Sequence, residues 1–125
     1  MSESSAAVAA LVTECVASYG AKVVDLDDQV TVEATVDQLV DVATALRDAP
    51  ATRFEMLIDL CAVDYSEYGK ADWKTSDVAT RTGFSRGVER GEHGGGSHEG
   101  PRFVVVYHLL SISHNHRVRV RVAAP

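Results

Sequence analysis

The sequence predicts an α+β fold, in which a small antiparallel or mixed sheet carries two helices on one face. Two observations support this class. Apolar residues recur at helical spacing over residues 8–19 and again over 39–46. Apolar and polar residues alternate over 30–36 and 117–122, which is the period of a strand with one wet face. The expected order is helix, strand, helix, strand, insertion, strand, strand, in a single domain covering residues 1–125.

The N-terminal segment predicts the first helix, because its apolar residues fall on one helical face. These residues are Val8, Leu11, Val12, Cys15, Val16 and Tyr19. Ser4 or Ser5 can cap the start of the helix, and Gly20 can take the left-handed conformation that ends it. The segment lacks the basic residues that begin a secretory signal, so we do not expect it to be one.

A strand and a second helix are expected next. The apolar face of the strand is formed by Val30, Val32, Ala34 and Val36. Thr35 and Gln38 occupy the two key positions of a capping box, which opens the helix. The inner face of this helix is formed by Leu39, Val42, Ala43 and Leu46. Pro50 closes the segment, because proline cannot continue a helix.

Residues 54–65 and 66–100 differ in character. The first range is apolar with a period-two tendency, so it predicts a strand, with a short buried helix as the alternative. The second range holds eight of the nine glycines and few aliphatic residues. A stretch of this length without a strong pattern is unusual inside a compact domain, so we expect a glycine-rich insertion loop between two strands. Trp73 is the residue expected to dock this insertion.

Residues 102–122 predict the last two strands, joined by the polar turn "SHNH", in which Asn115 suits the bend. Residues 103–112 are apolar on both faces, as in a central strand. Two sets of side chains follow if Ile112 faces Arg117 across the hairpin. The set on one face is Phe103, Val105, Tyr107, Leu109, Val118, Val120 and Val122. The set on the other face is His108, Arg117, Arg119 and Arg121.

Charge is unevenly distributed along the chain, whose formal net charge is −6. Residues 1–65 carry three basic and twelve acidic side chains, whereas residues 66–125 carry nine basic and six acidic ones. An acidic chain is a poor general binder of DNA or of acidic membranes. Its basic half can still meet an acidic partner.

The arginines are therefore the candidate protein-interface residues, together with the histidine expected beside them. They are Arg117, Arg119, Arg121 and His108. A solvated strand face that discourages unwanted strand pairing explains them equally well. A nucleic-acid platform fits less well, because the aromatic rings of Phe103 and Tyr107 are expected on the opposite face.

The histidines do not predict a metal site. His108, His114 and His116 are expected on different rungs or in a turn, with no carboxylate or cysteine nearby in the sequence to complete a zinc ligand set. His93 and His98 lie in the glycine-rich segment, where flexible backbone rarely preorganises ligands. No cofactor-binding loop of the phosphate-cradling kind is present in the sequence.

The cysteines and carboxylates predict no catalytic site either. Cys15 and Cys61 belong to no CxxC pair and lie in apolar stretches, so we expect buried thiols rather than a disulfide or a metal ligand set. Asp59, Asp64 and Glu67 are too scattered for a paired acid and base. We therefore expect a non-catalytic domain with no catalytic, cofactor-binding or metal-binding residues.

Two stretches resemble a known family. "RFEMLIDLCAVDY" (53–65) and "RFVVVYHLLSISHNHRVRVRV" (102–122) resemble the C subunit of bacterial NADH-quinone oxidoreductase, which represents the thirty-kilodalton subunit family of respiratory complex I. "QVTVEATVDQLVDVATALRDAP" (29–50) fits the same register. The insertion is longer than in many members and resembles that of some proteobacterial ones, including "GFSRGVE" (83–89). Family members continue beyond the point where this chain stops, so we expect an N-terminal fragment.

The resemblance implies a structural subunit of the peripheral arm of complex I, which is an NADH:quinone oxidoreductase and translocase. The subunit itself would bind no cofactor, while NADH, FMN, iron–sulfur clusters and quinone belong to the whole complex. Its partners would be other peripheral-arm subunits, chiefly the hydrogenase-like quinone-site subunit and its cluster-bearing neighbour. It would contact no nucleic acid, have no membrane span, and lie peripherally on the cytoplasmic side of the bacterial inner membrane.

Two other classes of function remain to be compared with this one. A free-standing RNA- or protein-binding module of ferredoxin-like topology is the alternative, and salt-dependent RNA binding lost on Arg119→Glu would favour it. A histidine-based metalloenzyme is the third class, and metal analysis of the purified chain tests it.

Overall fold

The computed structural model describes residues 3–26, 28–66, 68, 71–75, 88–93 and 100–125. These residues form two compact units. The first comprises Met1–Val63 together with Pro101–Pro125, and the second comprises Asp64–Gly100.

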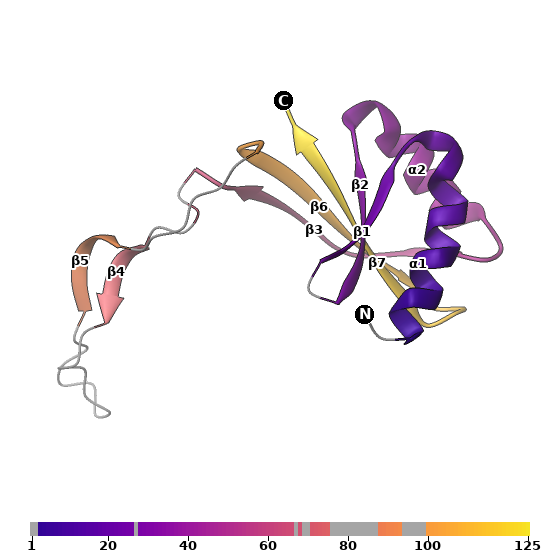
Figure 1. The fold of residues 1–125 in the computed structure, drawn as a ribbon, viewed down its shortest axis with the longest axis horizontal. Coiled ribbons are helices and arrows are strands. Elements are labelled where there is room, and N and C mark those ends of the chain that lie inside the picture. The colour runs from indigo at the N-terminus through magenta and orange to yellow at the C-terminus, as the bar shows by residue number, and fades with distance from the viewer. Residues whose placement is uncertain (1–2, 27, 67, 69–70, 76–87, 94–99) are drawn as a thin grey trace. The chain divides into compact units, whose positions relative to one another are not determined.

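The first unit is built on a five-stranded sheet with the strand order β1-β2-β7-β6-β3 (Figure 1). Its strands are β1 Lys22–Leu26, β2 Gln29–Ala34, β3 Met56–Asp64, β6 Phe103–Ser111 and β7 His116–Ala124. β2 runs antiparallel to β1 but parallel to β7, and β7 runs antiparallel to β6. The predicted α+β class is therefore confirmed, and the sheet is of the mixed kind.

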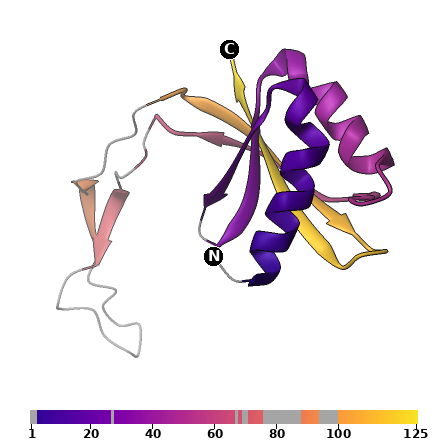
Figure 2. The same cartoon turned by 45° about the vertical axis from the view of Figure 1, so that its right-hand side comes forward.

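Two helices, α1 Glu3–Val16 and α2 Val36–Asp48, lie on the same face of this sheet (Figures 1 and 2). Their buried side chains pack on the valines of the two central strands. The shared core consists of Val8, Val12, Val16, Val30, Val32, Ala34, Val42, Leu46, Phe54, Val118, Val120 and Val122. Each fully buried valine or leucine contributes about 1.5–3 kcal/mol of transfer free energy. Among the described residues, neither helix has the length and apolarity that crossing a membrane requires.

The ends of the first helix differ partly from expectation. The helix already begins at Glu3, so Ser4 and Ser5 lie inside it and the prediction that one of them caps its start is wrong. The 3₁₀ turn η1 (Ala17–Tyr19) continues the chain to Gly20, whose φ is 77°. The predicted left-handed stop is confirmed, and only glycine takes this conformation without steric cost.

Strand β1 was not predicted. Its sequence "KVVDL" is short and places two valines side by side, so it shows no clean alternation. It forms a tight hairpin with β2 through Asp28, whose φ is 58°. Val36, expected on the strand, is instead the first residue of α2 and is 54% exposed.

The start of α2 follows the predicted capping box. The backbone N–H of Thr35 donates to Oε1 of Gln38 at 3.0 Å, and the side chain of Thr35 accepts from the N–H of Gln38 in return. The helix ends at Asp48, just before Pro50, as expected. Val42 and Leu46 are fully buried, so the predicted inner face is confirmed.

The β6–β7 hairpin has the predicted faces but a different register. Ser111 pairs with His116, and Tyr107 lies opposite Val120 rather than Val122, so the pairing of Ile112 with Arg117 is wrong. Because the register differs by two positions, every side chain keeps its expected face. Asn115 takes a φ of 55°, which its short polar side chain tolerates in the turn.

The second unit contains an antiparallel pair, β4 Ala71–Thr75 and β5 Val88–His93. The range 66–100 was predicted as a glycine-rich insertion, and this pair lies within it. The backbone of Trp73 lies opposite Arg90. The tryptophan side chain, His98 and residues 83–87 lie outside what the structure describes, so the docking role of Trp73 stays a prediction.

Candidate functional site

The sheet face turned away from the helices carries the predicted interface residues, and we call it the arginine face. It is defined by Arg117, Arg119 and Arg121 on β7 with His108 on β6. His108 lies directly opposite Arg119 in the register. Tyr107 packs with the core on the other face, so the described strands place no β6 aromatic ring beside the arginines as a stacking platform.

Arg119 is held within the domain. Its Nε donates to Oγ1 of Thr31 at 3.1 Å, and one terminal nitrogen donates to the carbonyl oxygen of Leu26 at 3.1 Å. Thr31 is fully buried, and it lies beside Arg119 in the parallel register of β2 and β7. Arg119 therefore satisfies polar groups of β1 and β2, which joins three strands at this face.

Arg121 and Arg117 differ in their partners. Arg121 approaches Glu33 at 3.4 Å, with side-chain exposures of 23% and 42%, so this ion pair contributes at most about 1 kcal/mol. Arg117 is exposed, and within the described ranges its side chain makes no hydrogen bond or ion pair. The three arginines of this face therefore differ in how firmly the domain holds them, and Arg117 is the one most available to a partner.

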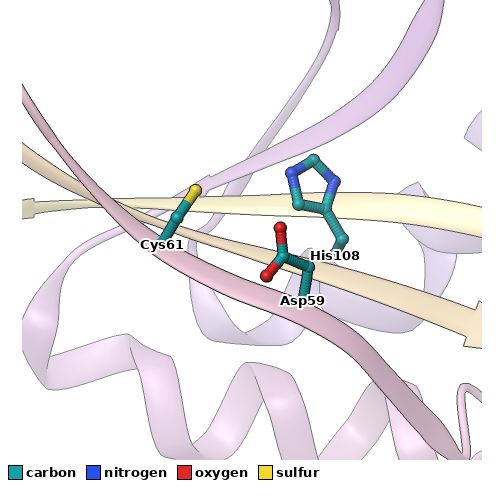
Figure 3. A group of neighbouring side chains, drawn as sticks. All are labelled: Asp59, Cys61 and His108. Atoms are coloured by element: carbon teal, nitrogen blue, oxygen red, sulfur yellow. The ribbon is translucent and has the colours of Figure 1, made fainter.

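His108 has two neighbours that the sequence did not indicate. Asp59 and Cys61 on β3 offer a carboxylate oxygen and a thiol sulfur, and these atoms and a ring nitrogen of His108 all lie within 4.8 Å of one another. Figure 3 shows the three side chains on the same side of β3 and β6. The i, i+2 spacing on β3 was the only local signal, because nothing in the sequence places β3 beside β6.

The two histidines of the β6–β7 turn, His114 and His116, are separated from His108. His114 and His116 stack at 5.7 Å between ring centroids, at the end of the β6–β7 hairpin. Nε2 of His114 lies 2.9 Å from the carbonyl oxygen of Pro50, which ties this turn to the loop after α2. The three histidines considered together in the sequence therefore do not converge.

Glu55, the residue before β3, binds the same β6–β7 turn. Its Oε1 accepts hydrogen bonds from the backbone N–H of Ile112 at 3.1 Å and from the N–H and Oγ of Ser113, both at 3.0 Å. Desolvation raises the pKa of Glu55, but hydrogen bonds from its own backbone, Ser113 and Ile112 outweigh this, so the pKa is lowered. The sequence did not indicate this contact.

Strand β3 is the most exposed apolar part of the described sheet. It lies at the edge of the strand order, and its large side chains face solvent. Their exposed fractions are Met56 44%, Leu57 51%, Ile58 42% and Leu60 53%. A depression of about 230 Å³ adjoins it, lined in part by Leu57, Leu109 and Phe54. Exposed apolar edges of this kind mark places where another chain binds.

The two cysteines occupy different environments. Both are free, as expected. Cys15 is half-buried, with its sulfur 3.8 Å from Oγ1 of the buried Thr52. Cys61 is exposed on β3, so the expectation that it is buried is wrong. The reason is that an apolar strand at a sheet edge has no second neighbour to cover it.

Comparison with known proteins shows which family this chain is similar to. The model of the family described as "Respiratory-chain NADH dehydrogenase, 30 Kd subunit" matches residues 32–125. The chain is 48% identical over 111 residues to the C subunit of NADH-quinone oxidoreductase from Legionella pneumophila (strain Corby), covering 89% of this chain and 45% of that protein.

Two further relatives carry the same name. The C subunit from Coxiella burnetii (strain Dugway 5J108-111) is 50% identical over 95 residues, covering 75% of this chain and 41% of the relative. That of Halorhodospira halophila is 45% identical over 108 residues, covering 77% and 44%. The chain therefore spans less than half the length of the curated relatives it matches.

Proposed function

Because the chain belongs to the family of the 30 kDa subunit of the respiratory-chain NADH dehydrogenase, we propose that it is a structural part of the C subunit of complex I. In this role it supports electron transfer from NADH to quinone, coupled to proton translocation, without a redox group of its own. FMN, iron–sulfur clusters and quinone are held by other subunits of the complex. The chain contributes by holding its neighbours in position.

The partners we propose are other subunits of the peripheral arm, chiefly the hydrogenase-like subunit at the quinone site and its cluster-bearing neighbour. The proposed location is the cytoplasmic side of the bacterial inner membrane, where the chain associates peripherally through these partners. Besides the exposed apolar edge of β3, the arginine face supplies a contact. It does so mainly through Arg117, which is exposed and has no partner among the described residues, so it can meet an acidic surface.

The observation that carries this proposal is the exposed apolar edge of β3. Its large side chains are exposed by 42–53%, although the sequence of the strand is as apolar as that of a core element. Obligate interfaces bury such apolar surface and resemble a domain core divided between two chains. A scaffold subunit leaves this kind of surface open until it is assembled.

Substitution of Ile58 by aspartate in the full-length subunit, expressed with an affinity tag in a bacterium that makes the complex, tests the proposal. Ile58 is 42% exposed on β3, so Ile58→Asp should leave the domain folded while placing a charge in the interface. We expect recovery of the hydrogenase-like subunit to fall at least about tenfold, as for a central interface residue, together with NADH:quinone activity of the membranes.

Val40→Asp is the matched control, because Val40 is a 72% exposed apolar residue of α2, away from the sheet edge. Its effect on partner recovery should be small. Circular dichroism of both purified variants checks that each is folded. Equal partner recovery with Ile58→Asp and with the unchanged protein would contradict the proposal.

A further inference from the structure

We propose that Asp59, Cys61 and His108 form a binding site for one divalent metal ion of the zinc class. The three side chains offer an oxygen, a sulfur and a nitrogen atom, all within 4.8 Å of one another (Figure 3). This inference does not depend on the proposed function, because it rests on the geometry of β3 and β6 alone. A zinc ion is not redox-active, so it is compatible with a subunit that holds no electron-transfer centre.

The donors sit on a firm scaffold. Asp59 and Cys61 are two residues apart on β3 and share a face of that strand, while His108 projects from β6, the neighbouring strand of the same sheet. Sites on strands hold their ligands more accurately than sites on loops. The carboxylate of Asp59 is also oriented by a hydrogen bond, because the N–H of Leu60 donates to its Oδ1 at 2.9 Å. A carboxylate has two oxygens, so this hydrogen bond still allows Asp59 to bind a metal ion.

The cluster is sheltered from water on the β6 side, whereas Asp59 and Cys61 are exposed and so accessible to a metal ion. Val106 and Leu110 flank His108 on the same face of β6, and they are buried and half-buried. In the described sheet, the cation directly opposite His108 is Arg119, but its guanidinium donates to Thr31 and to the carbonyl oxygen of Leu26, which lie toward the other edge of the sheet. Its charge is therefore directed away from the three donors.

The donor set selects the kind of metal. One thiolate and one imidazole disfavour calcium and magnesium, which take oxygen ligands, and suit zinc or its spectroscopic substitute cobalt. Metal bonds of about 2.0–2.3 Å bring tetrahedral donors to roughly 3.3–3.8 Å apart. Because the three donor atoms already lie within 4.8 Å of one another, the side chains need to close by at most about 1.5 Å on binding. The thiol of Cys61 loses its proton to solvent in this step, and a water molecule or a partner group takes the fourth position. Binding would tie the edge strand β3 to β6.

Titration of the full chain with Co²⁺, followed by absorption spectroscopy, tests the site. We expect one equivalent to bind, with the sulfur-to-cobalt charge-transfer band of a thiolate ligand, and Zn²⁺ to displace it. Cys61→Ser should abolish this band. His108→Ala and Asp59→Asn should each weaken binding at least about tenfold, since even changes to groups behind the ligands cost that much.

The chain provides matched controls for the cysteine and the histidine donors. Cys15→Ser removes the other cysteine, and His114→Ala removes a histidine outside the cluster, so both should bind Co²⁺ as the unchanged chain does. A double His93→Ala, His98→Ala variant tests the glycine-rich segment in the same way. Circular dichroism shows that each variant is folded.

Several outcomes would overturn the proposal. They are the absence of a stoichiometric Co²⁺ complex, a charge-transfer band that survives Cys61→Ser, and a band that disappears in Cys15→Ser or in the double histidine variant. Loss of the band in Cys61→Ser alone, with weaker binding in the His108 and Asp59 variants, would support it.

Discussion

Strands β7 and β3 are both nine residues long and both carry many apolar side chains, yet they differ in burial. The valines of β7 are exposed by only 1–3%, because β2 and β6 flank the strand and two helices cover it. The large apolar residues of β3 are exposed by 42–53% at the edge of the sheet. The first strand therefore stabilises this domain, whereas the second leaves apolar surface exposed, which we propose another chain covers.

The largest effect that tests this comparison is expected from the same substitution at two leucines. Leu46 of α2 is fully buried in the core above the central strands, whereas Leu60 of β3 is 53% exposed. Leu46→Ala should lower the free energy of unfolding by about 2–5 kcal/mol, because it leaves a cavity. Leu60→Ala should lower it by less than about 1 kcal/mol. Urea denaturation of both variants measures the difference, and equal losses would show that β3 belongs to the core.

An intermediate effect on the free energy of unfolding is expected for substitutions on the arginine face. Arg119→Ala leaves the hydroxyl of buried Thr31 and the carbonyl oxygen of Leu26 without their donor, which should cost about 1–3 kcal/mol of unfolding free energy. Arg117→Ala removes an exposed side chain and should change it by at most about 0.5 kcal/mol. Denaturation curves separate the two, and partner recovery in cells should be sensitive to Arg117. A larger loss of stability for Arg117→Ala than for Arg119→Ala would contradict the conclusion that the domain holds Arg119 more firmly than Arg117.

The smallest effect is expected at the contact between the start of β3 and the β6–β7 turn. The pKa of Glu55 is lowered in the folded chain by the hydrogen bonds it accepts, although desolvation opposes them. Its contribution to stability is therefore present above the ordinary glutamate pKa of about 4.3 and is lost as pH falls through the lowered value. Glu55→Gln should be less stable than the unchanged chain at pH 7, and the difference should shrink in acid.

Urea denaturation at several pH values measures this effect. Glu14→Gln is a control, since Glu14 is an exposed glutamate of α1 for which no hydrogen bond or ion pair is seen among the described residues. A stability difference for Glu55→Gln that stays constant down to strongly acid pH would contradict the assigned contact.

The helices and their buried faces could be predicted because their signals are local. The spacing of Val8, Val12 and Val16 determines which side of α1 is apolar, and the capping box of Thr35 and Gln38 marks the start of α2. Strand β1 was not predicted, because its five residues include two adjacent valines and show no alternation of apolar and polar side chains. It is stabilised as a strand by its pairing with β2. The hairpin faces were correct because alternation survives a shift of two positions.

The candidate sites were less predictable because they depend on contacts between distant residues. Alternation alone placed His108 on the same face as the arginines. It could not show that Arg119 bonds to Thr31, since the parallel pairing of β2 with β7 joins residues that are 88 positions apart. Nor could it place Asp59 and Cys61 beside His108, because that requires β3 to neighbour β6.

By itself, the sequence determined both helices, the strands β2, β3, β6 and β7, and the apolar side of each helix, because periodicity and capping act over a few neighbouring residues. The tertiary structure alone decided which apolar strand is enclosed and which lies at the edge, and which polar side chains meet. Strand order is set by the packing of segments far apart in the chain. For that reason β7 and β3, similar in composition, have opposite environments here.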